Sequence, residues 1–113
     1  MATFRLLAFN NPVPGREDEY NTWYTQQHLP DVLRTPGFKR AQRFKLSSTQ
    51  KDGTAQPWKY LAMYECEAEH PQQLLDALAA RVGTPACPIS SALSDQRTLW
   101  VVEPITEVVQ AQA

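Results

Sequence analysis

The stretch YNTWYTQQHLPD, residues 20–31, holds the residues of this chain that are best suited to chemistry. His28 leads, because an imidazole with an ordinary pKa of ~6.5 can accept and donate a proton near neutral pH. Asp31 follows three residues later, close enough in sequence to accept a hydrogen bond from one ring nitrogen and fix the tautomer. Tyr24, one helical turn before His28, could donate a phenolic hydrogen bond to a developing oxyanion. This set predicts proton transfer.

The same segment also suits a helix that only packs against a core. Its aromatic residues and histidine recur at i, i+3, i+4 and i+8, which places them on one helix face: Tyr20, Trp23, Tyr24 and His28. A histidine in the last turn of a helix also interacts favourably with the helix C-terminus. Both interpretations stay open at this stage. Trp23 suits packing better than chemistry, and it is kept as a candidate for binding substrate.

Further aromatic side chains recur at period two in the later part of the chain, which places them on single faces of strands. The candidates for substrate binding among them are Tyr60, Tyr64 and Trp100. They would either wall an apolar pocket, where a buried tyrosine hydroxyl needs a partner, or fill the core or a dimer interface. Arg40 and Arg43 fall on opposite faces of one strand, so at most one can point inward, toward an acidic side chain or a substrate carboxylate.

Hydrophobic periodicity and breaker residues predict six elements. They are strands over residues 3–10, 37–47, 58–67 and 97–105, and helices over residues 15–28 and 71–82. Because Pro30 disfavours helical backbone at Leu29, the first helix is expected to end near His28. The order β-α-β-β-α-β predicts an α+β, ferredoxin-like fold with a four-stranded antiparallel sheet. Residues 48–56 read as an exposed hairpin loop, and residues 106–113 as a frayed tail.

Both faces of the predicted sheet are apolar, although two helices can cover only one of them. On the strand over residues 58–67, Leu61 and Met63 point away from the tyrosine face. On the last strand, Leu99 points away from Trp100 in the same manner. A sheet with one solvated face would alternate apolar with polar residues. A second copy of the same sheet is the simplest cover, so we expect a homodimer.

Bulk composition narrows the possible partners. The 113 residues predict one domain over residues 1–113. Eleven basic and twelve acidic residues leave a net charge of -1, which favours neither nucleic acid nor a membrane as partner. The chain has no apolar run long enough for a membrane span or a signal peptide, so a cytoplasmic location is expected. Cys66 and Cys87 form no CxxC pair, and nucleotide motifs are absent, so no metal and no cofactor are expected.

The first helix and the residues after it resemble the EthD-like family. The resemblance is carried by the spacing W-Y-x-x-x-H-x-P, from Trp23 to Pro30, and by the P-G-F that begins at Pro36. It covers residues 4–102 and implies a dimeric α+β barrel, in which two sheets pack face to face with the helices outside. It also implies a pocket between sheet and helices near the end of the first helix. Relatives in this superfamily include cofactor-free monooxygenases, haem-degrading monooxygenases, cyclases and isomerases, so the fold narrows the function poorly.

These observations favour a cofactor-independent enzyme of the lyase, isomerase or cyclase type, acting on a hydrophobic, aromatic or carbonyl-bearing metabolite. In this hypothesis His28 moves a proton, Asp31 orients the imidazole, and Tyr24 or a strand tyrosine stabilises negative charge. One alternative is a non-catalytic dimeric protein that binds a hydrophobic ligand or supports a partner enzyme. Another is a haem-linked monooxygenase in which His28 is the axial ligand.

Overall fold

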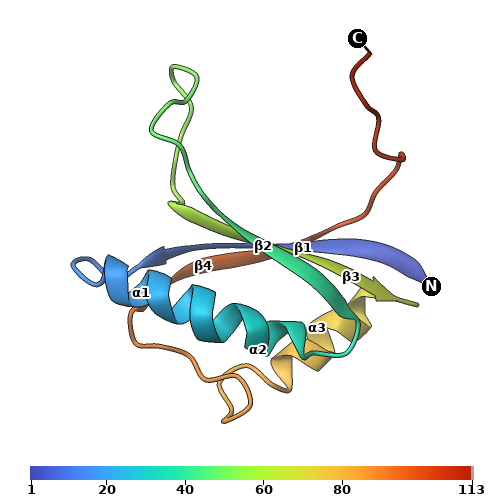
Figure 1. Cartoon of the computed structure of the whole chain (residues 1–113), viewed down its shortest axis with the longest axis horizontal. Coiled ribbons are helices and arrows are strands. Elements are labelled where there is room, and N and C mark those ends of the chain that lie inside the picture. Colours follow the sequence, from blue (N-terminus) through green and yellow to red (C-terminus); the bar gives the residue numbers. More distant parts are fainter. Residues whose placement is uncertain (113) are drawn as a thin grey trace.

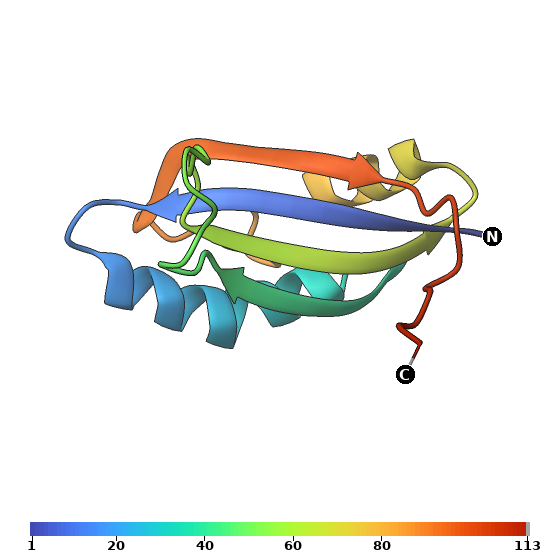
Figure 2. The same cartoon turned by 90° about the horizontal axis from the view of Figure 1, so that it is seen from above.

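A four-stranded antiparallel sheet with helices on one face forms the fold in a computed structural model, which describes residues 1–112 (Figures 1 and 2). The strands are β1 (Ala2–Pro12), β2 (Phe38–Lys45), β3 (Tyr60–Ala68) and β4 (Leu93–Val102). They lie in the order β2-β3-β1-β4, and each neighbouring pair is antiparallel. The predicted βαββαβ order and the ferredoxin-like α+β fold are confirmed. The expected domain and tail both include residue 113, which lies outside the described residues.

The first helical segment runs past the point where it was expected to stop. It consists of α1 (Glu17–Trp23), a π-helical turn η1 (Tyr24–His28) and α2 (Leu29–Leu33). The prediction of an end near His28 is therefore wrong. In the π turn the N–H of Leu29 donates to the carbonyl of Tyr24, five residues earlier. This wider turn moves the carbonyls that the Pro30 ring would otherwise contact, so the helix accommodates the proline.

Other boundaries move by a few residues. Helix α3 (Pro71–Ala79) begins at the predicted proline, where the N–H of His70 donates to Oε1 of Gln73 at 3.0 Å. Strand β3 begins two residues later than expected, which leaves Trp58 outside it. Strand β4 begins four residues earlier than expected and ends at Val102. A register shift lies between Asn10 and Pro12 in its pairing with β1, and sequence patterns do not show such a shift.

The core lies between the helices and the side of the sheet that faces them. Along β3 every second side chain is buried on this side, as the period-two pattern predicted. The buried apolar residues are Phe4, Leu6, Tyr20, Tyr24, Val32, Phe38, Tyr60, Ala62, Tyr64, Cys66, Ala68, Leu74, Cys87 and Ala92. Tyr20 is fully enclosed, and its hydroxyl donates to Oδ1 of Asn10. That bond satisfies the polar end of an otherwise apolar side chain.

The other face of the sheet is not covered by any helix in residues 1–112. Figure 1 shows the helices below the sheet, whereas the β2–β3 connection and the C-terminal segment rise on the opposite side. On this face the ring of Phe9 packs against Trp100 and Trp58, with centroid separations of 5.1 and 6.4 Å. Trp100 is 55% exposed and Phe44 is 41% exposed. The uncovered face therefore carries large apolar side chains, as expected.

Candidate active site

A cavity of about 230 Å³ lies between the sheet and the helices, beside the π turn. Most of its wall is apolar and comes from β1, β4, α2, α3 and the segment after α3, with Val32, Leu78, Ile89 and Leu99 among its residues. The polar or charged residues of the wall are Asn10, Tyr24, His28, Tyr64, Arg97 and Thr98. The cavity thus brings together His28 and Tyr24 from the first helical segment with Tyr64 from β3.

His28 is held between aromatic rings. Its imidazole stacks on Trp23, with ring centroids 4.6 Å apart and planes at 26°. The ring of Tyr24 meets it edge-on at 4.8 Å. Only 7% of the residue is exposed. Trp23 does not line the cavity, so its role in the structure is to support the imidazole rather than to meet a ligand.

Burial determines the protonation state of His28. Loss of solvent lowers the pKa of the imidazole to about 4, because desolvation penalises the charged form. The nearby charge of Asp31 raises the pKa, and the charges of Arg97 and Arg43 lower it further. The sequence-based expectation of a pKa near ~6.5 is therefore corrected. At neutral pH the ring is uncharged, so it can accept a proton, whereas the imidazolium form that could act as an acid is scarcely populated.

The two ring nitrogens of His28 have different surroundings. Nδ1 lies 3.8 Å from Sγ of Cys87, a fully buried thiol whose pKa is raised by burial. Nε2 has no hydrogen-bond partner within residues 1–112, and this atom is not fully buried. His28 lines the cavity, and Nε2 is its ring nitrogen without a hydrogen-bond partner in the described residues.

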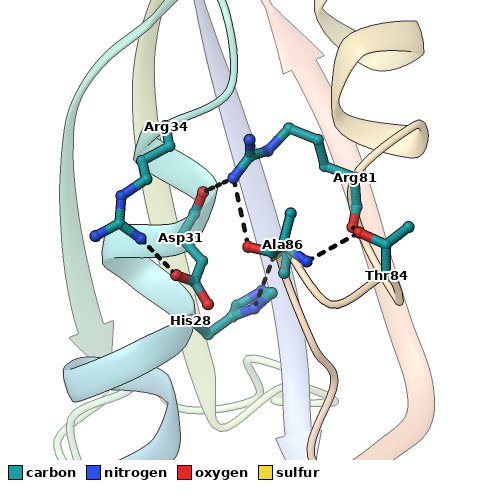
Figure 3. A network of polar contacts seen from close by, with 7 residues as sticks. His28, Asp31, Arg34, Arg81, Thr84 and Ala86 are labelled. Atoms are coloured by element: carbon teal, nitrogen blue, oxygen red, sulfur yellow. Dashed lines mark hydrogen bonds and ion pairs between the residues drawn. The ribbon is translucent and has the colours of Figure 1, made fainter.

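Asp31 does not take the orienting role that its sequence position suggested. Its Oδ1 accepts a hydrogen bond of 2.7 Å from Nη1 of Arg34, and its carbonyl accepts one of 2.9 Å from Nη2 of Arg81 (Figure 3). The reason is that the helix continues through Pro30, which places Arg34 one helical turn after Asp31. The carboxylate therefore acts on His28 through its charge, while Cys87 is the neighbour of Nδ1.

Two tyrosine hydroxyls accompany the imidazole. The hydroxyl oxygens of Tyr24 and Tyr64 lie 3.4 Å apart, and both residues are almost fully buried. Burial raises the pKa of each phenol. Both hydroxyls therefore stay protonated across the physiological range and can donate hydrogen bonds to an oxygen in the cavity.

Two other predicted substrate-binding residues lie elsewhere. Tyr60 is buried on the helix-facing side, but its hydroxyl donates to the carboxylate of Glu17 and accepts from Nδ2 of Asn21 at 3.0 Å. Trp100 pairs with Leu7 of β1 and lies on the uncovered face. The expectation that these two side chains line the pocket is corrected, because strand periodicity gives the face of a residue but not its place along the sheet.

The two arginines of β2 lie on opposite faces, as predicted. Arg40 pairs with Glu65 on the uncovered side. Arg43 points toward the helices, where its guanidinium lies 4.5 Å from the centroid of the Tyr24 ring. There it donates to Oγ1 of Thr25 at 2.8 Å. The inward arginine thus stacks on aromatic rings, and within residues 1–112 it forms no ion pair with an acid.

No sequence pattern identified Cys87 and Arg97 as residues of this site. Cys87 is 59 residues from His28, and no spacing rule links the two. Period-two spacing is enough to place Arg97 on the same strand face as Leu99. That this face lines the cavity follows only from the pairing register of β4 with β1, which the sequence does not show. Within residues 1–112, no group of three or more metal-ligating side chains is found. The helices of this part of the chain are also too short and too polar to span a membrane.

Several solved structures share this fold. An EthD-like protein from Ralstonia eutropha superposes with a TM-score of 0.67 at 13% identity, covering 96% of each chain. An EthD family protein from Bacillus halodurans gives 0.61 at 15% identity, with 91% of this chain and 99% of that chain covered. The haem-degrading protein MhuD from Mycobacterium tuberculosis, solved with two haems in its active site, gives 0.61 at 16% identity, with 94% and 99% covered.

The predicted resemblance to EthD-like proteins is therefore confirmed at the level of the fold. No curated protein sequence matches the chain. Residues 14–81 match a family described as "Domain of unknown function (DUF4286)". Because this match spans more than half of the 113 residues, the chain belongs to the DUF4286 family.

Proposed function

We propose that the cavity binds a small, mainly apolar molecule with a carbonyl group and that His28 exchanges a proton with it. The observation that carries this proposal is an uncharged imidazole whose Nε2 has no hydrogen-bond partner within residues 1–112, placed with two tyrosine hydroxyls in a mainly apolar cavity. The volume of about 230 Å³ lies below the roughly 300–1,000 Å³ of pockets for drug-sized ligands. The ligand is accordingly a compact metabolite.

The proton transfer needs no cofactor. Nε2 of His28 takes a proton from the carbon next to the carbonyl, and the electron pair of that C–H bond forms an enolate. The enolate oxygen accepts hydrogen bonds from the hydroxyls of Tyr24 and Tyr64, which offsets its new charge. Where a C=C bond is conjugated with the enolate, return of the proton to the far end of that conjugated system shifts the double bond and completes an isomerisation; where a leaving group lies on the carbon next to the enolate carbon, its expulsion gives a lyase reaction.

This role fixes the tautomer of the imidazole. The lone pair must be on Nε2, so the hydrogen is on Nδ1 and points at Sγ of Cys87, a weak acceptor. A base with a pKa of about 4 is weak in the free protein. In the transition state, however, negative charge develops beside the ring and favours the imidazolium form. The negative charge that develops during the reaction therefore raises the pKa of His28 in the transition state.

Hydrogen–deuterium exchange tests the proposal. Phenylpyruvate has an aromatic ring, a carbonyl and acidic protons on the adjacent carbon, and ¹H NMR in D₂O follows the loss of those protons. The wild-type protein is expected to accelerate exchange above the buffer rate, and His28→Gln to return it to that rate. His70→Gln, at an exposed position outside the cavity, is the matched control and should exchange as the wild type does. A folded His28→Gln protein with wild-type exchange would rule out the mechanism.

A binding protein without turnover is the second candidate, and the pKa of about 4 favours it, because so weak a base suits a hydrogen-bonding role. In that case saturable binding would persist without exchange. Haem, which MhuD holds, is a weaker candidate. An uncharged imidazole is the form that binds iron, but the cavity is smaller than pockets for drug-sized ligands and haem is larger than most of those. The cavity as it stands therefore does not fit haem.

A homodimer is part of the same proposal. The uncovered face exposes Trp100, Phe44 and Val102, each by more than a third. Apolar side chains of this size are costly to leave in water over an extended sheet. A second copy that packs its own uncovered face against this one would bury them and leave the helices and the cavity on the outside of each protomer.

A further inference from the structure

We infer that the cavity selects a carboxylate and that Arg97 is the group that binds it. This inference deepens the proposed function, on which it rests for the cavity itself, by naming the charge of the ligand. Three observations support it: the charge of the wall, the position of Arg97 on its strand and the lack of a partner for Arg97 within residues 1–112.

The first observation is the charge of the cavity wall. Among residues 1–112, Arg97 is the one side chain lining the cavity that carries a formal charge at neutral pH, since His28 is uncharged there. The other lining residues are apolar or carry neutral amide and hydroxyl groups. A wall with one positive charge and no negative charge attracts anions and repels cations.

The second observation is where the strand register places Arg97. It lies directly opposite Asn10 in the antiparallel pairing of β4 with β1. Directly opposite residues share a face of the sheet, and Asn10 is buried on the helix-facing side. Leu99, two residues further along the strand, lines the same cavity. The side chain of Arg97 therefore starts from the cavity side of the sheet, at its exposed edge.

The third observation concerns the partners of the arginines. Six of the seven arginines donate a side-chain hydrogen bond to another residue: Arg5, Arg16, Arg34, Arg40, Arg43 and Arg81. Within residues 1–112, Arg97 makes no such bond and no ion pair. Asp31, whose charge also reaches His28, is already paired with Arg34. The guanidinium of Arg97 keeps its paired donors available, and a carboxylate matches their geometry.

Binding of a carboxylate at Arg97 also has a consequence for His28. The charge of Arg97 reaches the imidazole and is one of the causes that lower its pKa. A bound carboxylate neutralises that charge, so it raises the pKa of His28 and makes the imidazole a stronger base. The ligand would thus activate the residue that acts on it, with the apolar wall holding the rest of the molecule.

Two probes of the same shape separate charge from hydrophobic binding. Phenylacetate carries a carboxylate, and phenylacetamide replaces it with a neutral amide. Calorimetric titration of the wild-type protein is expected to show phenylacetate bound about tenfold more tightly, equivalent to about 1.4 kcal/mol. The preference should weaken as salt is added, because Arg97 is exposed.

Variants assign the preference to one side chain. Arg97→Gln should bind both probes equally, and Arg97→Lys should keep part of the preference. Lys51→Gln removes the same charge from the exposed β2–β3 connection and should behave as the wild type does. Circular dichroism confirms that each variant is folded.

The outcomes separate this inference from the proposed function. Equal wild-type affinities for the two probes, or a preference that survives Arg97→Gln, would overturn the role of Arg97 and leave cavity binding intact. Failure of the wild type to bind either probe would overturn the inference and the cavity as a binding site together. Because phenylacetate binding involves no proton transfer, a charge preference can stand even where the exchange assay fails.

Discussion

Sγ of Cys87 lies 3.8 Å from Nδ1 of His28, so the inner edge of the imidazole meets a thiol and not a carboxylate. Burial raises the pKa of that thiol, which keeps it uncharged. A carboxylate in this position would stabilise the imidazolium form, whereas an uncharged thiol does not. The pairing therefore orients the ring without making it more basic, which is consistent with the pKa of about 4.

The first prediction concerns stability and pH. In the unfolded chain His28 takes up a proton near pH ~6.5, but in the folded protein it does so only near pH 4. Its contribution to the free energy of unfolding is therefore complete above pH ~6.5 and is lost as the pH falls toward 4. Between pH 7 and pH 4.5 the loss should be about 2–3 kcal/mol, measured by urea unfolding.

His28→Gln isolates this contribution from those of other titrating groups. The variant should lose less stability than the wild type over the same pH interval, by about 2–3 kcal/mol. An identical pH dependence for the wild type and His28→Gln would show that the imidazole is not held uncharged by the fold.

The second prediction concerns the hydroxyls of the cavity. Tyr24→Phe and Tyr64→Phe each remove one hydrogen-bond donor from the enolate and should slow phenylpyruvate exchange by up to about 10²-fold. Tyr60→Phe is the matched control, because that hydroxyl is bonded to Glu17 and Asn21 outside the cavity. If all three variants exchange at one rate, the cavity hydroxyls have no part in the reaction.

The third prediction concerns assembly. Light scattering of the wild type should give about twice the chain mass of 12.8 kDa. Trp100→Glu places a charge on the uncovered face and should give the mass of one chain. Ala79→Glu, on α3 at the opposite side of the sheet, should leave the dimer intact. A wild-type mass of 12.8 kDa at micromolar concentration would contradict the dimer.

The sequence was sufficient for the element order and for the faces of the strands. Along β3 the alternation of Tyr60, Ala62 and Tyr64 depends only on the pleat, which is fixed by backbone geometry. The end of the first helix, predicted near His28 from Pro30, was wrong, because the rule for residues before proline considers only local steric conflict. A single π turn relieves that steric conflict, and its presence depends on packing that no pattern in the sequence displays.

The site was predicted in part for a related reason. Tyr24 and His28 share a helix face, so helical spacing was enough to pair them. The contact of His28 with Cys87 depends on how distant segments of the chain pack. The place of Arg97 in the cavity wall depends on the same packing. Asp31 is only three residues from His28 in sequence, but its carboxylate accepts a hydrogen bond from Arg34 and not from the imidazole. Proximity along the chain did not determine which side chains meet.

The central claim is that an uncharged imidazole of His28 meets the ligand in the cavity. Its most direct test is an NMR titration of the His28 ring, first in the free protein and then with saturating phenylacetate. We expect a pKa of about 4 in the free protein, ring resonances that shift when phenylacetate binds, and a higher pKa in the complex. A free-protein pKa near ~6.5, with ring resonances that do not respond to phenylacetate, would contradict the claim.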